Sequence, residues 1–163
     1  MKILLFVVTI TLLIVVQTLY FHFPTVGPYL PNFGLVMAVV AGYRLDMRTS
    51  GYVGALIGFI EDALSLNFFG LNILIKSLIC FFVGFIHIKL IVDLPLTVGL
   101  LAFVLTFIEY FITGYLYTLG SPVVIEGGIY TELILNGISN MLAALVLNQI
   151  LIQKLKYKVQ SFE

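Results

Sequence analysis

The chain has 163 residues, of which 61% are hydrophobic and 10% are charged, and its formal net charge is zero. A soluble domain averages about one-quarter charged residues, so this composition excludes an ordinary soluble protein and indicates an integral protein of a lipid bilayer. Zero net charge gives no sign of a nucleic-acid partner, and the single cysteine excludes an intrachain disulfide.

Six apolar segments follow one another, and each is predicted to be a membrane-spanning helix. The first covers residues 3–23, which is long enough to cross a hydrocarbon layer of about 30 Å. It lacks a small-x-small cleavage site, so we expect a retained helix rather than a signal peptide. The other expected helices cover about 30–43, 51–68, 71–88, 94–117 and 129–152. Together they predict an all-α bundle in which residues 1–163 form a single membrane domain.

The second segment is short, since its fourteen residues span only about 21 Å as a helix. The basic residues indicate that it still crosses the membrane. Seven of the eight lie at the start of the chain, at every second gap between segments, or at the end: Lys2, Arg44, Arg48, Lys89, Lys154, Lys156 and Lys158. Cytoplasmic loops collect Lys and Arg, so this pattern predicts six crossings with both termini in the cytosol.

The third segment, with the sequence GYVGALIGFIEDALS, carries Gly54, Gly58 and Asp62 at four-residue spacing, which places all three on one helix face. Small residues on one face let another helix approach closely. We expect this face to pack inside the bundle rather than to form a dimer interface, because a six-helix bundle has many internal faces to fill.

The expected spans contain five ionisable residues, Glu61, Asp62, Lys76, Glu109 and Glu132. Each costs about 2.5 to 3.5 kcal/mol at the bilayer centre, so each should face the bundle interior, water or a partner. The helix rise places all five in the outer half of the bilayer, with Lys76 about 9 Å below the outer boundary, level with Glu109 and close to Asp62. One lysine cannot neutralise three deep acids. At least one carboxyl is therefore expected to be protonated, exposed to water or paired with a cation of another protein.

Other polar residues extend this cluster along the same helix faces. Asn72 and Cys80 share the face of Lys76, Asn136 and Asn140 follow Glu132, and Thr106 and Thr113 flank Glu109. Three interpretations stay open: a structural polar network, a partner-binding surface, and a transport or catalytic site. The sequence has no nucleophile and base pair, no phosphate-cradling loop and no metal-ligand spacing, so we predict no enzyme activity, cofactor or metal site.

A further pattern begins at Pro31 and Asn32 and continues through the brief second helix, which ends at Arg44. It then includes Gly51, Gly54, Gly58, Asp62, Ser65, Gly70, Leu71 and Asn72. This order of residues resembles the family of the rod shape-determining protein MreD, to which the chain is also similar in length, segment number and orientation. The residue-level likeness is concentrated between Pro31 and about Gly84.

The resemblance implies a non-enzymatic, multi-pass protein of the bacterial inner membrane that helps to maintain rod cell shape. Family members associate with MreC and act with the rod-type glycosyltransferase and transpeptidase, and with MreB filaments, in side-wall peptidoglycan synthesis. In such a subunit we expect Gly54 and Gly58 to serve helix packing. The residues expected to make intramembrane polar or partner contacts are Asp62, Asn72, Lys76, Glu109, Glu61 and Glu132.

The same family is similar in architecture to the substrate-binding subunits of energy-coupling-factor vitamin transporters, which gives an alternative function. Those subunits bind a small molecule in the outer half of a six-helix bundle. They couple to their partner through small residues spaced by three on the first helix, whereas residues 3–23 here contain no Gly or Ala. Their binding pockets also use longer external loops than the segments at 24–29 and 66–70. Both differences favour the membrane scaffold.

Overall fold

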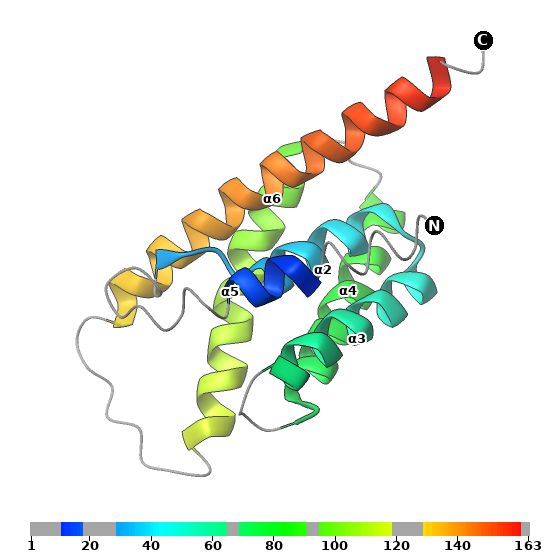
Figure 1. The fold of residues 1–163 in the computed structure, drawn as a ribbon. Coiled ribbons are helices and arrows are strands. Elements are labelled where there is room, and N and C mark those ends of the chain that lie inside the picture. The colour runs from blue at the N-terminus through cyan, green and yellow to red at the C-terminus, as the bar shows by residue number, and fades with distance from the viewer. Residues whose placement is uncertain (1–10, 18–28, 65–68, 91–94, 119–128, 161–163) are drawn as a thin grey trace.

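The computed structural model describes residues 11–17, 29–64, 69–90, 95–118 and 129–160, and all regular structure in these ranges is helical (Figure 1). A helical stretch at residues 11–17 precedes five longer helices. These are α2 (Phe33–Arg44), α3 (Met47–Leu64), α4 (Leu71–Leu90), α5 (Pro95–Thr118) and α6 (Ile129–Gln160). The all-helical fold class predicted from the sequence is therefore confirmed for the described residues.

Several helix boundaries differ from the predicted ones, and at the starts of α2 and α3 the cause is a capping polar residue. Helix α2 begins at Phe33 rather than at 30, since the side chain of Asn32 accepts a 3.0 Å hydrogen bond from the N–H of Leu35. Helix α6 continues to Gln160, beyond the predicted end at 152. The predicted helix 3–23 falls within the described residues only at 11–17, and the predicted end of the third helix, at 65–68, lies outside them.

Helix α3 begins at Met47 and not at 51, because Asp46 caps it. The carbonyl of Asp46 accepts a 2.8 Å hydrogen bond from the N–H of Ser50, and its carboxylate accepts a 3.0 Å bond from the N–H of Thr49. Hydrogen bonds from the side chain and the backbone of Thr49 lower the pKa of Asp46 below its ordinary value. The turn between α2 and α3 is therefore closed by a local cap.

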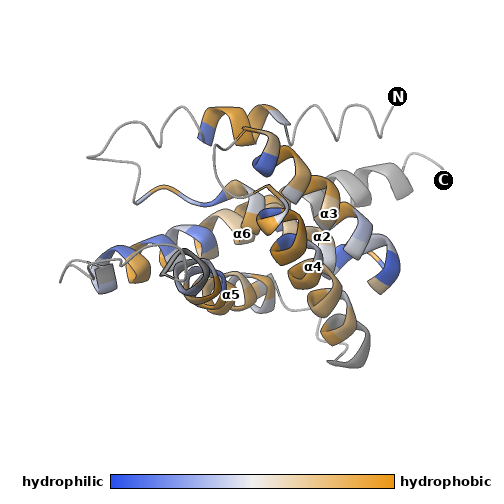
Figure 2. Cartoon of the chain, turned by 90° about the horizontal axis from the view of Figure 1, so that it is seen from below, coloured by the Kyte–Doolittle hydropathy of each residue, from blue (hydrophilic) through white to orange (hydrophobic). Residues whose placement is uncertain are grey.

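Helix α2 forms the core of the fold, although it is the shortest of the five long helices. Its ten residues from Gly34 to Tyr43 are all buried, so it is packed on every side. Helices α3 and α4 form one close pair, α5 and α6 form another, and α4 barely touches α5. Helix α2 packs on all four and thereby joins the two pairs (Figures 1 and 2). A helix that is apolar all round, as α2 is, requires such surroundings.

The α3–α4 pair is close because glycines replace side chains at the contact. A Cβ atom built on Gly54 would overlap the carbonyl oxygen of Lys76, and one built on Gly58 would overlap the carbonyl oxygen of Asn72. Both glycines are buried against α4 inside this chain. The backbones of the two helices thus meet along the face that the four-residue spacing of these glycines defines.

The outer faces of α5 and α6 are largely apolar, while the buried polar residues lie inside the bundle. Exposed large hydrophobic residues recur every four positions along α5 (Leu96, Leu100, Val104, Ile108) and along α6 (Tyr130, Ile134, Ile138, Leu142, Val146, Ile150). The stretches Leu96–Tyr115 and Tyr130–Ile150 are long and apolar enough to cross a membrane. Hydrophobic colours dominate α4 and α5 in Figure 2. Apolar exterior faces of this length are suited to contact with lipid tails.

We expect Gly58→Ala to lower the free energy of unfolding by about 1 to 3 kcal/mol, because the new methyl group meets backbone atoms of α4 that cannot turn aside. Thermal unfolding of the purified protein in detergent would measure this. Gly114→Ala on α5 is the matched control, because no described atom lies within 4 Å of a Cβ built there. Equal stability of the two variants would contradict the close α3–α4 contact.

Candidate functional site

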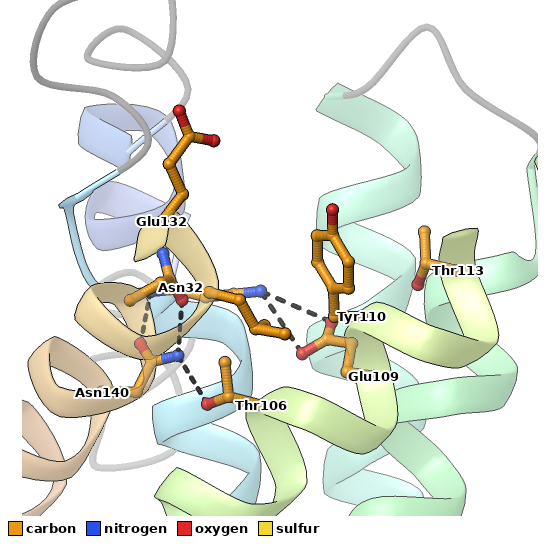
Figure 3. A pocket seen from close by; sticks show the side chains of 9 residues that line it. Asn32, Thr106, Glu109, Tyr110, Thr113, Glu132 and Asn140 are labelled. Atoms are coloured by element: carbon orange, nitrogen blue, oxygen red, sulfur yellow. Dashed lines mark hydrogen bonds between the residues drawn. The ribbon is translucent and has the colours of Figure 1, made fainter. Parts of the chain in front are cut away.

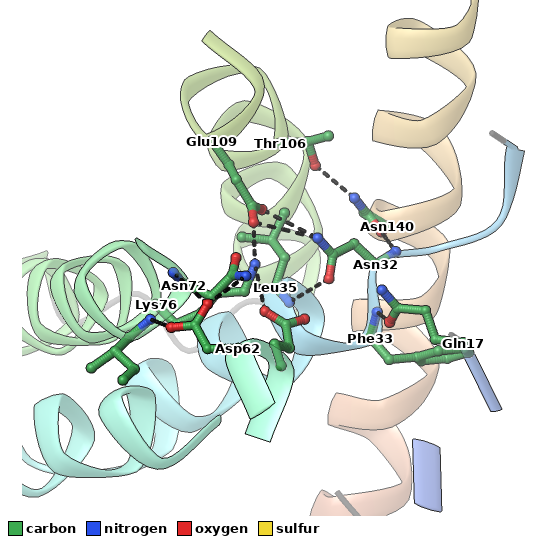
Figure 4. Close-up of polar contacts among 12 residues, drawn as sticks. Gln17, Asn32, Phe33, Leu35, Asp62, Asn72, Lys76, Thr106, Glu109 and Asn140 are labelled. Carbon is green, nitrogen blue, oxygen red and sulfur yellow. Dashed lines mark hydrogen bonds and ion pairs between the residues drawn. The ribbon is translucent and has the colours of Figure 1, made fainter. Parts of the chain in front are cut away.

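A buried lysine lies at the meeting point of three helices. Lys76, on α4, is fully buried, and its ammonium nitrogen donates a hydrogen bond to Oε1 of Glu109 on α5 (Figure 4). The same nitrogen lies 3.4 Å from Oε2 of Glu61 on α3. Both glutamates are only 9% exposed. The structure therefore contains the pair of Lys76 and Glu109 that their equal depth predicted. Glu61 is a second carboxylate partner of the same lysine.

The two glutamates also lie against the N-terminal end of α2. A Cβ atom built on Gly34 would overlap Oε1 of Glu61, so this carboxylate packs directly on the first turn of the helix. The side-chain amide of Asn32 donates to the carboxylate oxygens of Glu109 at 3.4 and 3.5 Å. The N-terminus of a helix carries a partial positive charge of about half an elementary charge, which favours nearby anions. Lys76 and this helix end together compensate the two carboxylates.

Asp62 follows Glu61 on α3 and caps the next helix. The 3.4 Å ion pair between α3 and Lys76 is made by Glu61. The carboxylate of Asp62 instead accepts hydrogen bonds at the start of α4, from the N–H groups of Gly70, Asn72 and Ile73 at 2.9, 3.2 and 3.1 Å and from the side chain of Asn72 at 3.0 Å. Adjacent residues on a helix point about 100° apart, so the two acids serve different partners.

Each of the three buried acids thus has partners within this chain. Glu61 and Glu109 share Lys76, and Asp62 caps α4 at a turn where Gly70 has a φ of 102°. That at least one deep carboxyl is protonated, exposed to water or paired with a cation of another protein stays a prediction. The N-terminal ends of α2 and α4, which the fold brings to these carboxylates, add partners that a count of side-chain charges omits.

A chain of amide and hydroxyl groups connects this cluster to α6. The backbone N–H of Asn32 donates to the side chain of Asn140 at 2.6 Å, and the side-chain amide of Asn140 donates to Thr106 at 2.9 Å (Figure 4). Asn136 donates to the carbonyl of Leu30 at 2.9 Å. Hydrogen bonds and ion pairs therefore link α2, α3, α4, α5 and α6 around the N-terminal end of α2.

A cavity of about 420 Å³ opens beside this network, between α5 and α6 (Figure 3). It is lined by Asn32, Thr106, Glu109, Tyr110, Thr113, Glu132, Leu133, Asn136 and Asn140. The polar residues around Glu109 on α5 and those that follow Glu132 on α6 thus face one another across the cavity. Glu132 is exposed and belongs to this cavity rather than to the Lys76 cluster.

The sequence reasoning missed two contributors to the site and one contact at the other end of the bundle. Asn32 is the hub of the network, and a Pro-Asn pair before an apolar run is a helix-start signal that could have indicated it. Gly34 gave no signal in the sequence. At the far end of α2, Arg44 donates two hydrogen bonds to Asn148 of α6, at 3.0 and 2.6 Å.

In the part of the chain that the structure describes, fold and site define a helical bundle with a largely apolar exterior, two helices of membrane length and an internal ionic network. Within the described residues, no group of three His, Cys, Asp or Glu side chains is placed to hold a metal ion. No protein-family model matches the sequence, and comparisons with curated proteins and with solved structures likewise give no match.

We expect Lys76→Met to lower the free energy of unfolding by about 3 to 5 kcal/mol, because it leaves two buried carboxylates without their cation. Chemical denaturation of the detergent-solubilised protein would measure the loss. Glu132→Gln also changes one charge, but at an exposed position, and should alter stability by no more than about 0.5 kcal/mol. A Lys76→Met variant as stable as Glu132→Gln would show that the cluster does not hold the bundle.

Proposed function

We propose that this chain is a multi-pass protein of the bacterial inner membrane, with six crossings and both termini in the cytosol. The positions of charge support this topology. Arg44 and Arg48 lie at one end of the bundle, where α2 ends and α3 begins, while Asn32, Glu109 and Glu132 gather at the other end. The positive-inside rule assigns the arginine end to the cytosol.

Cysteine labelling tests this topology. In spheroplasts, a membrane-impermeant maleimide should label Tyr29→Cys, near the N-terminal end of α2, and should label Arg48→Cys only after the membrane is opened. Both positions are exposed, and the natural Cys80 is buried, so the unmodified chain provides the unreactive control. Labelling of Arg48→Cys in sealed spheroplasts would contradict the orientation.

We propose further that the protein is a non-enzymatic subunit of the bacterial elongation complex, which binds MreC and helps to position side-wall peptidoglycan synthesis. One observation supports it above others: residues that carry the resemblance to the MreD family act together in a single structural unit. Gly54 and Gly58 bring α3 onto α4, and Asp62 closes the same hairpin on Gly70 and Asn72.

The use of the buried charges is in keeping with a scaffold. Lys76 pairs with both Glu61 and Glu109 across three helices, and Asp62 caps the start of α4. Groups engaged in this way fix the relative positions of helices. A rigid bundle with an apolar exterior can present its outer helix faces to the membrane helices of MreC and of the rod-type glycosyltransferase and transpeptidase, next to MreB filaments in the cytosol.

We expect the chain to restore rod shape in a rod-shaped bacterium depleted of its own MreD, and MreC to co-purify with it from native membranes. Gly58→Leu should abolish both effects because it separates α3 from α4. Gly114→Leu, at an open position on α5, should preserve both. Cell shape under the microscope and MreC recovery would be measured in parallel. Failure of the unmodified chain in both assays would contradict the assignment.

The cavity between α5 and α6 favours one second candidate, a substrate-binding subunit of an energy-coupling-factor type vitamin transporter. Its volume of about 420 Å³ falls in the range of small-molecule sites, and it lies at the end of the bundle that the charge pattern assigns to the outside. A vitamin recovered from the purified protein in equal molar amount would favour this candidate over the scaffold.

A further inference from the structure

The lining of the cavity between α5 and α6 is acidic. It includes two carboxylates, those of Glu109 and Glu132, and no basic side chain. Lys76 compensates Glu109 from outside the lining. Among the described residues, no basic side chain lies within ion-pair distance of Glu132. The cavity therefore presents an acidic rim to whatever enters it.

The hydrogen-bonding groups of the cavity fall into two sets. Those on its floor bond to one another, and those at its rim can accept hydrogen bonds from a ligand. On the floor, the Asn140 amide donates to Thr106 and to Asn136, and its oxygen accepts from the backbone of Asn32. At the rim, Glu132 lies on one side of the cavity, and Tyr110 and Thr113 lie on the other (Figure 3). Carboxylate and hydroxyl oxygens accept hydrogen bonds, so the rim suits a ligand rich in donors.

The rim lies at the level of lipid headgroups if α5 and α6 cross a bilayer. Thr113 is two residues from the end of the membrane-length stretch Leu96–Tyr115, and Glu132 is two residues from the start of Tyr130–Ile150. Exposed apolar side chains, Ile108 and Phe111 on α5 and Ile134 on α6, flank the cavity on the outer faces of the same helices. A molecule at the membrane surface can therefore reach the rim while its apolar part stays in the lipid.

We propose that this cavity binds a primary ammonium group at the membrane surface. Three N–H donors on a single positive centre match a rim of one carboxylate and two hydroxyl groups, and the charge compensates Glu132. The ammonium group belongs either to an aminophospholipid headgroup or to a soluble amine. The proposal concerns this cavity alone and does not depend on binding to MreC.

Lipid nanodiscs of defined composition provide the test. The full chain is placed in nanodiscs of phosphatidylcholine, in nanodiscs containing phosphatidylethanolamine, or in phosphatidylcholine nanodiscs with added ethanolamine. Thermal unfolding gives the stabilisation by each amine, and native mass spectrometry counts retained phosphatidylethanolamine. We expect the unfolding temperature to rise with a primary amine. Phosphatidylcholine, whose quaternary nitrogen has no N–H donor, is the reference from which the rise is measured.

Three variants locate the binding. Glu132→Gln should weaken amine binding about tenfold, since it removes a charge-assisted hydrogen bond. Thr113→Val should weaken it by a smaller factor. Asp46→Asn removes the same charge from an exposed carboxylate at the other end of the bundle, where Asn also caps a helix, and should leave binding unchanged.

The two sources of the amine give different results, and either supports the proposal when Glu132→Gln removes the effect. Stabilisation by phosphatidylethanolamine alone identifies a lipid headgroup, and stabilisation by ethanolamine identifies a soluble amine. The proposal is overturned if neither probe stabilises the chain, or if Glu132→Gln responds as the unmodified chain does. A failure to recover MreC would leave all these outcomes unchanged, so the two proposals fail separately.

Discussion

The ammonium group of Lys76 connects parts of the bundle that otherwise share little contact. Its nitrogen, on α4, reaches Glu61 on α3 and Glu109 on α5, and the described parts of α3 and α5 do not pack on one another. A charge buried without a partner costs several kcal/mol, so the folded state must bring these three side chains together. This constraint fixes both the rotation of each helix about its axis and its height relative to the others.

The remaining polar groups of the core are arranged around this requirement. The N-terminal end of α2 reaches the cluster through Asn32 and through the direct packing of Glu61 on Gly34, and it adds its own partial positive charge. Asn140 and Thr106 continue the network to α6. A short, fully buried α2 is therefore necessary, because it brings a helix end into the centre of the bundle and joins the two helix pairs.

The sequence predicted the helices and the depth of the polar groups, but it did not predict which groups face one another. Long apolar runs showed where the helices lie, and helix rise put Lys76 level with Glu109. The choice between Glu61 and Asp62 depends on the rotation of α3, which an apolar pattern cannot define when both faces of the helix are hydrophobic. The caps at Asn32 and Asp46 moved the starts of α2 and α3 away from the predicted ones, because local hydrogen bonds decide where a helix begins. The close packing of Glu61 on Gly34 is a tertiary contact without a local sequence signature.

The most direct test of the central role of Lys76 is the coupling energy between Glu61→Gln and Glu109→Gln, from unfolding free energies of the two single variants and the double variant. Either single change leaves Lys76 with one carboxylate and relieves repulsion between the two acids. The double change leaves the buried ammonium without any. Since the two glutamates share this partner, the cost of the double change should exceed the sum of the single costs by about 1 to 3 kcal/mol. Costs that simply add would show that α3 and α5 are not joined through Lys76, and would contradict the account.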